Sequence, residues 1–252
     1  MNRIVEPEIL DALPPADSRA LRSRRDLRRV NSWMGNHKIM ANALKENCSS
    51  APGQITELGA GDGNFLLRVA QEIKVGPSSG LSASGMNATL LDRQKIISSE
   101  TLAAFQSIGW RTDILTADVF DWSKNENSAE IVIANLFLHH FEDARLAELL
   151  RKISRRAKLF VAVEPRRFAF PFLCGQLLWL IGCNRVTRHD AAASVRAGFS
   201  GDELSALWPK QNHWQLTEQD AGFFSHLFIA QKRAADILST ENSPAHKMSA
   251  AR

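Results

Sequence analysis

Short apolar runs alternate with longer segments of helical periodicity over most of this chain. Between residues 54 and 164 each run has the length of a strand, and the segments between the runs repeat apolar residues every three or four positions. The runs cover residues 54–60, 88–92, 113–119, 130–136 and 158–164, and the helical segments include 64–73, 95–108 and 142–156. Strands that alternate with helices form right-handed βαβ units, so the pattern predicts an α/β fold with a parallel sheet and helices on both faces. Two more strand candidates follow at 213–217 and 224–231.

The regular alternation occupies only the middle of the chain. The first fifty residues have helical patterns rich in Arg and Leu, and the segment 49–53 breaks them. We therefore expect a helical N-terminal unit over 1–50 that acts as a lid, and a main domain over 51–233. Within that domain, 168–210 is expected to be an insertion that covers a substrate. The polar residues 234–252 are expected to form a flexible tail.

The composition is that of a chain with a substantial core. Of its 252 residues, 44% are hydrophobic and 23% are charged, which excludes a largely disordered chain. The three cysteines are odd in number and lack CxxC spacing, so we expect neither a disulfide framework nor a structural zinc site. Tyr is absent, so a mechanism that needs a phenol is excluded, and a general base near neutral pH would have to be a histidine.

The longest uncharged stretch of the C-terminal half is too short and too interrupted to span a membrane. It covers 17 residues, 168–184, and contains Pro171, Gly175 and Gly182. Contact with a membrane surface through 168–183 stays open, and so does a homodimer face on this segment. The first eleven residues contain three acidic side chains and no apolar run, so we expect no signal or transit peptide and a cytoplasmic protein.

Charge is distributed unevenly along the chain. The formal net charge is +4 and the pI is about 9.1. Residues 57–142 carry 11 acidic and 6 basic side chains, whereas residues 145–167 carry 8 basic and 2 acidic ones. The basic excess is therefore local, and the acidic half suits a cationic ligand. For this reason we do not expect nucleic acid as a partner.

The most informative segment is the glycine-rich turn ITELGAGDGNF between the first run and the following helix. Gly59, Gly61 and Gly63 let the backbone turn sharply and approach a ligand, and the helix N-terminus behind them offers unpaired N–H groups. A dinucleotide site would need a third glycine of the motif at position 64, which is Asn64. Glu57, just before the loop, disfavours a pyrophosphate and favours a ligand with a positive group.

Polar residues end three of the later runs. In open α/β sheets a ligand lies at the carboxyl ends of the strands. The second run ends on Asp92, which is suited to accept hydrogen bonds from two ribose hydroxyls. The third ends on Asp118 and Val119, where the carboxylate suits an exocyclic amine, and the fourth ends on Asn135. Each residue alone is typical of a cap or turn, but together and in this order they indicate one ligand site.

With these motifs in place, the chain resembles the class I S-adenosylmethionine (SAM)-dependent methyltransferases. The resemblance is specific over about residues 50–165 and rests on the motifs ELGAGDG at 57–63, Asp92, AD at 117–118 and ANLFLHHF at 134–141. It implies a Rossmann-like, seven-stranded, mostly parallel sheet whose last strand is antiparallel. It also implies SAM as the cofactor.

The same resemblance implies a role for each motif. The three loop glycines would line the methionine part of SAM, and Glu57 would approach its ammonium group. Asp92 would hold the ribose, and Asp118 would hold the adenine. Val119 and Asn135, which accompany these motifs at the strand ends, are also expected to contact the cofactor.

Methyl transfer from a sulfonium is a direct displacement that needs alignment and exclusion of water, with no covalent nucleophile. A hydroxyl acceptor benefits from a base near neutral pKa, and His139 and His140 follow the fourth run, where the methyl group should lie. A packing role for these histidines is the alternative. A divalent metal would require clustered carboxylates near the fifth run, where Glu164 stands alone, so we expect no metal.

The absence of several known methylase motifs narrows the range of expected methyl acceptors. The chain lacks the [DN]-P-P-[YFW] sequence of amino methylases and the Pro-Cys pair of cytosine C5 methylases, and its aromatic segment 168–181 suits a hydrophobic molecule. EPRR at 164–167 and SVRAGF at 194–199 more weakly resemble bacterial secondary-metabolism methyltransferases that occur with chalcone-synthase-like polyketide synthases. We therefore expect O-methylation of a hydrophobic or aromatic small molecule. An RNA methyltransferase and a catalytically silent cofactor-binding scaffold stay as alternatives.

Overall fold

The computed structural model describes residues 2–14, 16–48, 53–75, 85–122, 129–169, 177–210 and 212–233. One expected segment and part of another fall outside these ranges. The expected tail, 234–252, lies wholly outside the described residues, and so does part of the expected cover insertion, 170–176.

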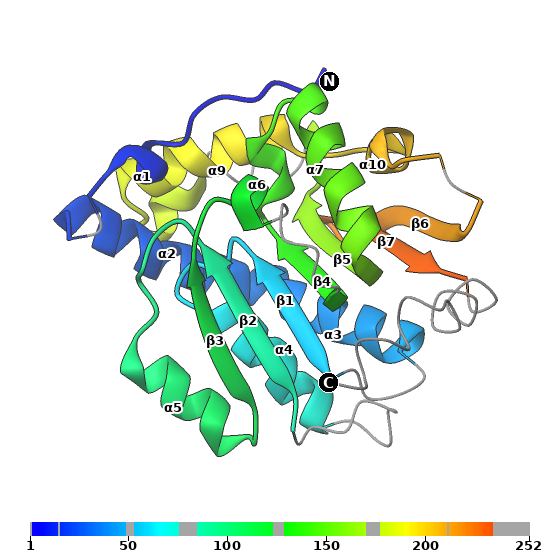
Figure 1. Ribbon diagram of the computed structural model, residues 1–252. Coiled ribbons are helices and arrows are strands. Elements are labelled where there is room, and N and C mark those ends of the chain that lie inside the picture. The colour runs from blue at the N-terminus through cyan, green and yellow to red at the C-terminus, as the bar shows by residue number, and fades with distance from the viewer. Residues whose placement is uncertain are drawn as a thin grey trace.

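Seven strands form one sheet in the order β3-β2-β1-β4-β5-β7-β6 (Figure 1). The strands are β1 (Gln54–Leu58), β2 (Asn87–Asp92), β3 (Arg111–Thr116), β4 (Ala129–Asn135), β5 (Ala157–Pro165), β6 (Trp214–Ala221) and β7 (Ser225–Lys232). The first five are parallel, and β7 is antiparallel to both β5 and β6. The expected mostly parallel sheet with an antiparallel last strand is confirmed. Strand order reverses at β1, which has β2 on one side and β4 on the other, and this is the place where such sheets bind ligands.

Helices cover both faces of the sheet, as the alternating pattern predicts. They are α1 (Ile9–Ala12), α2 (Ser18–Met34), α3 (Asn36–Asn47), α4 (Asn64–Val75), α5 (Ser99–Ser107), α6 (Val119–Trp122), α7 (Asp143–Arg156), α9 (Arg185–Ala197) and α10 (Glu203–Leu207), with 3-10 turns η1 (Leu138–His140) and η2 (Leu177–Ile181). Figure 1 shows α6 and α7 in front of the sheet, and α1, α2 and α9 gathered beyond the carboxyl ends of β2 and β3. The helices α1 and α2 both contact α9.

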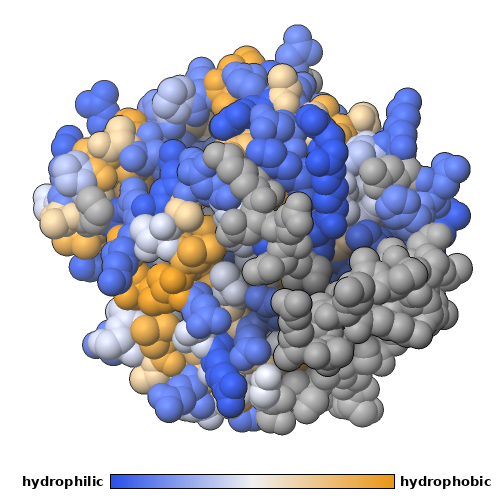
Figure 2. Space-filling model, viewed as in Figure 1, coloured by the Kyte–Doolittle hydropathy of each residue, from blue (hydrophilic) through white to orange (hydrophobic). Residues whose placement is uncertain are grey.

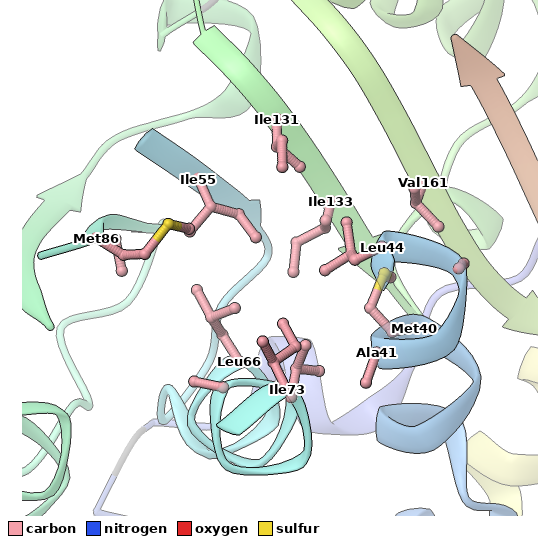
Figure 3. Close-up of a cluster of buried hydrophobic side chains, with 14 of the residues drawn as sticks. Met40, Ala41, Leu44, Ile55, Leu66, Ile73, Met86, Ile131, Ile133 and Val161 are labelled. Atoms are coloured by element: carbon pink, nitrogen blue, oxygen red, sulfur yellow. The ribbon is translucent and has the colours of Figure 1, made fainter. Parts of the chain in front are cut away.

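Two hydrophobic clusters lie on opposite faces of the sheet because side chains alternate along each strand. In β4, Ile131 and Ile133 belong to one cluster, whereas Val132 and Ala134 belong to the other. In Figure 3, side chains of α3 and α4, among them Leu44, point toward the side chains of β1 and β4. The helix α3, which belongs to the expected unit 1–50, therefore packs in the core of the sheet domain.

Figure 2 shows a largely hydrophilic surface on this side of the molecule, with a group of hydrophobic residues over β2 and β3. Among the described residues, no helix combines the length and the apolar character that a membrane span requires.

Candidate active site

A cavity of about 820 Å³ opens at the carboxyl ends of β1, β2 and β4. The strand ends and the glycine loop form one wall, and residues 5–12 together with α2 form another. All but one of the residues predicted from the sequence line it: Glu57, Gly59, Gly61, Asp92, Asp118, Val119, Asn135, His139 and His140. Four separate segments of the sequence thus meet at one edge of the sheet.

Gly63 is the exception: it does not line the cavity, and its contact with the ligand stays a prediction. A Cβ atom at this position would lie 3.2 Å from Thr101 of α5 and 3.3 Å from Leu90 of β2. The missing side chain at Gly63 therefore allows the start of α4 to pack closely against β2 and α5.

The turn after β1 depends on glycine at two positions for different reasons. At Gly59 the φ angle is +69°, and a Cβ atom would lie 2.3 Å from the ring of Phe137, so this glycine makes room for the loop after β4. At Gly61 the φ angle is +55°, and a Cβ atom would meet nothing within 4 Å, because this glycine borders the cavity. The N–H of Gly61 donates a hydrogen bond of 2.9 Å to Oδ2 of Asp92. That bond fixes the glycine loop relative to β2.

Both strand-end carboxylates are held by backbone amides. Besides the bond from Gly61, Asp92 accepts a hydrogen bond of 2.7 Å from the N–H of Gln94 at Oδ1. Asp118 accepts one of 2.8 Å from the N–H of Phe120, at the start of α6. A carboxylate oxygen can accept two hydrogen bonds, so these contacts orient the two groups and leave them capacity for a ligand.

Glu57 is a buried carboxyl group on the wall of the cavity. Its residue is 2% exposed, and its Oε2 atom has no hydrogen-bond partner among the described residues. Burial, together with the negative charges of Asp62 and Asp92, raises the pKa of Glu57 well above its ordinary value. A buried carboxyl group in this state would be stabilised as a carboxylate by a cationic ligand.

Glu164, at the end of β5, organises the loop after β4. Its Oε1 atom accepts hydrogen bonds of 3.0 Å from the N–H of Phe137 and 2.9 Å from that of Leu138. Its Oε2 atom lies 2.9 Å from Nδ1 of His139. Leu136, where the loop turns, has a φ angle of +51°. The sequence indicates Glu164 only as a carboxylate that ends a strand, and its role in this loop was not predicted.

His139 lies between two carboxylates. The residue is 2% exposed, and its Nε2 atom lies 3.4 Å from Oε1 of Glu8, opposite the contact with Glu164. Burial opposes a charge on the ring, but the hydrogen bonds and negative charges of Glu164 and Glu8 outweigh it and raise the pKa of His139 to about 9. At neutral pH this ring is therefore a cation that donates to both carboxylates.

His140 differs from His139 in its protonation, because its pKa is lowered. Its ring centroid lies 4.3 Å from that of His139, and its Nδ1 atom lies 3.6 Å from a carboxylate oxygen of Asp11. Burial and the positive charge of His139 lower the pKa of His140, although Glu8 and Asp11 partly oppose this. At neutral pH the cavity is therefore lined by one neutral imidazole beside one imidazolium.

The N-terminal segment is fastened across this side of the cavity. Arg3 pairs with Asp143 at 2.6 Å and donates a hydrogen bond of 2.7 Å to the carbonyl oxygen of Phe141. The first two amides of α1 donate to the carboxylate of Asp190 at 2.9 and 3.0 Å. Between these contacts lies Glu8, whose hydrogen bonds and ion pair lower its pKa to about 2 despite burial. No motif in the sequence indicates that Glu8 belongs to the site.

Glu8, His139 and His140 each offer a ligand atom, and these atoms lie within 4.8 Å of one another. This set does not suit a metal ion, because both ring nitrogens of His139 face carboxylate oxygens and its pKa of about 9 keeps the ring protonated at neutral pH.

No family model and no curated protein matches the chain. Solved structures do match. The plantazolicin methyltransferase BamL, in complex with a triazolic desmethylPZN analog and SAH, has a TM-score of 0.61 and 11% identity over 89% of this chain and 93% of its own. The chain has the class I methyltransferase fold. The plantazolicin methyltransferase BpumL in complex with SAH has a TM-score of 0.59 and 12% identity, covering 86% of this chain and 92% of its own. An O-methyltransferase family protein from Burkholderia thailandensis has a TM-score of 0.55 and 15% identity, covering 86% of this chain and 60% of its own.

The methyltransferase fold accounts for the place of the cavity. In a sheet of this topology the switch point lies between β1 and β4, and the residues that the sequence predicted as cofactor contacts lie around it.

Proposed function

We propose that this protein transfers a methyl group from SAM to a hydroxyl group of a hydrophobic or aromatic small molecule. The observation that carries the proposal is the buried, unpartnered Oε2 atom of Glu57 on the cavity wall, beside the open face of Gly61. A ligand with a positive group fits there, and SAM carries both an ammonium and a sulfonium group. When bound, SAM supplies an electrophilic methyl group.

The remaining strand ends provide the contacts that a nucleoside needs. Asp92 and Asp118 have oxygens already oriented by backbone amides, and their second lone pairs can accept from ribose hydroxyls and from an adenine amine. Asn135 has its amide oxygen fixed by a hydrogen bond of 2.9 Å from Asn36 of α3. These side chains are therefore held in place by the fold before a ligand arrives, which reduces the cost of ordering them.

His140 is the residue that we assign as the general base. Its imidazole is neutral at neutral pH and lines the cavity, so it can accept the proton of an acceptor hydroxyl. His139 acts as a positioning residue, because its protonated ring contacts both Glu8 and Glu164, and its charge adds to the effect of burial that lowers the pKa of His140. The N-terminal segment that carries Glu8 helps to exclude water from the acceptor side.

Calorimetry and a transfer assay test the proposal. SAH should bind with micromolar affinity and NAD should not. Purified protein with radioactive SAM should label members of a panel of phenolic and pyrone compounds. Binding of NAD in place of SAH would contradict the cofactor assignment. Labelling of RNA alone would favour an RNA methyltransferase, and SAH binding without any labelled product would favour a silent scaffold.

Asp92→Ala tests the ribose contact. It should weaken SAH binding by about 1.5–3 kcal/mol, the range for hydrogen bonds to a charged group. The control is Asp113→Ala, which removes an exposed carboxylate from β3, away from the cavity wall. Equal SAH affinity in the two variants would place the ribose elsewhere.

Substitution of His140 tests the assignment of the general base. His140→Gln should lower kcat by about 10²- to 10⁴-fold, the usual contribution of general-base catalysis, and leave SAH affinity unchanged. It should also remove the acidic limb of the pH–rate profile. If His140→Gln keeps full turnover, alignment alone drives the transfer and the assignment fails.

A further inference from the structure

Outside the cavity, the outer side of α2 combines arginines with an exposed tryptophan. Arg22, Arg25, Arg29 and Trp33 follow one another at intervals of three, four and four residues, so they lie on one side of the helix. All four are exposed, and Trp33 is 68% exposed. The opposite side of α2 borders the cavity through Leu27 and other residues.

The turn η2 lies alongside this row of side chains. Arg22 donates a hydrogen bond of 3.2 Å to the carbonyl oxygen of Gly182, and Arg29 donates one of 3.3 Å to that of Ile181. Beside these contacts Trp179 is 57% exposed and Leu180 is 61% exposed. We call the surface formed by Arg22, Arg25, Arg29, Trp33, Trp179 and Leu180 the Arg-Trp face.

The Arg-Trp face is positively charged. Its cationic members are Arg22, Arg25 and Arg29, and the one acidic residue of α2 is Asp26. Asp26 is 3% exposed and pairs with Arg29 at 3.1 Å, so its charge is buried against the protein and offsets one arginine. A second copy of this chain would bring the same positive face, and like charges oppose that contact. A negatively charged partner is complementary.

The apolar members of the face identify the kind of partner. Tryptophan side chains favour the boundary between water and the lipid headgroups, and leucine favours the acyl region below it. Arginines beside them attract anionic headgroups. A nucleic acid could pair its phosphates with the arginines and stack its bases on the tryptophans, but it has no apolar region that would bury the exposed Leu180.

We propose that the Arg-Trp face docks on the surface of a membrane that contains anionic lipids. The cavity lies on the other side of the same helix, so docking places it within about 10 Å of the bilayer, the width of one helix. This inference does not depend on the proposed methyl transfer, because docking needs neither SAM nor an acceptor.

Flotation of the full chain with lipid vesicles tests the proposal. Binding is expected to vesicles of phosphatidylcholine with about 30% phosphatidylglycerol, to be weaker to phosphatidylcholine alone, and to fall as salt is raised. The double variant Arg22→Gln/Arg25→Gln should bind about 30-fold more weakly, given the usual contribution of each basic residue near an anionic surface. The control is Arg151→Gln/Arg155→Gln, which removes the same charge from exposed positions on α7 and should bind like the unaltered protein.

Insertion of the apolar side chains is tested separately. Vesicles with brominated acyl chains should quench tryptophan fluorescence of the bound protein, and Trp33→Phe/Trp179→Phe should lose most of that quenching while keeping the circular dichroism of the parent. Equal binding to both kinds of vesicle, equal loss in the two arginine double variants, or quenching that survives the tryptophan substitutions would overturn the proposal. Displacement from vesicles by transfer RNA, with the same arginine dependence, would reassign the face to nucleic acid.

Discussion

The protonated ring of His139 is predicted to stabilise the folded protein, and this contribution to the free energy of unfolding should be lost as the pH becomes mildly alkaline. The carboxylates of Glu8 and Glu164 raise its pKa from 6.5 to about 9 against the effect of burial. In the unfolded chain the ring returns to its ordinary pKa. A difference of this size corresponds to about 3 kcal/mol, at about 1.4 kcal/mol per pH unit.

The sign follows from the direction of the shift. Because the folded state binds the proton more tightly than the unfolded state, the contribution is complete below about pH 6.5. It declines as the pH rises toward 9 and is absent above that value. The contact between Glu8 and His139 also affects stability in acid. Because folding lowers the pKa of Glu8 from 4.5 to about 2, its contribution to stability is lost as the pH falls through this range.

The variant Glu8→Gln tests this contribution. It keeps the shape of the side chain and removes one of the two negative charges beside His139. Nuclear magnetic resonance of the ring protons gives the pKa of His139 directly, and urea unfolding between about pH 6 and pH 9.5 gives the loss of stability. We expect that loss to be clearly smaller in the variant, because one of the two carboxylates is removed while the opposing effect of burial on the ring stays the same. The control is Glu6→Gln, which removes a neighbouring carboxylate that pairs with Arg196 at the surface.

Either of two results would contradict the predicted role of Glu8 and Glu164. One is a His139 ring that titrates near pH 6.5 in the unaltered protein, which would mean that burial outweighs the carboxylates. The other is an identical pH profile of unfolding in the unaltered protein and in Glu8→Gln, which would mean that Glu8 does not reach the ring in solution.

Two other predictions concern Glu57 and Gly198. Because the pKa of Glu57 is raised well above its ordinary value, binding of SAM should ionise it and release up to about one proton, measured by calorimetry in buffers of different ionisation enthalpy. Glu57→Gln should abolish that release, and a release of the same size in the variant would contradict the assignment. Gly198→Ala places a Cβ atom 2.3 Å from the carbonyl oxygen of Pro165 and should lower the free energy of unfolding by about 1–3 kcal/mol. Gly201→Ala, whose Cβ would meet nothing within 4 Å, should cost about 1 kcal/mol through its φ angle of +60° alone, and an equal cost at both sites would argue against the clash.

The cofactor side of the site could be predicted from local sequence because it follows from strand direction. Asp92, Asp118 and Asn135 end or follow parallel strands, and parallel strands bring their carboxyl ends to one edge of a sheet. Glu57 and the glycine loop lie between β1 and α4, so their order along the chain already places them at that edge. Gly63 lies in the same motif, and the sequence carries no signal of its close approach to Leu90 and Thr101.

The places of Glu164 and Glu8 in the site could not be predicted from local sequence. The pairing of Asn135 with Val163 places Glu164 beside the loop after β4, but only the turn of that loop at Leu136 aims its amides at the carboxylate. Glu8 stands 131 positions from His139 in the chain, and nothing local links the two. Likewise, α3 has the helical pattern of an N-terminal unit, and only its packing shows that it belongs to the core.

Periodicity and backbone conformation are properties of neighbouring residues, so the α/β alternation, the glycine turn and the strand-end carboxylates can be predicted from the sequence. Which of two adjacent histidines is charged depends on the tertiary structure. His139 and His140 are equivalent in the sequence, but one ring faces two carboxylates and the other faces that charged ring. Protonation depends on burial and on charges that act through space, and these come from residues that only the fold brings together.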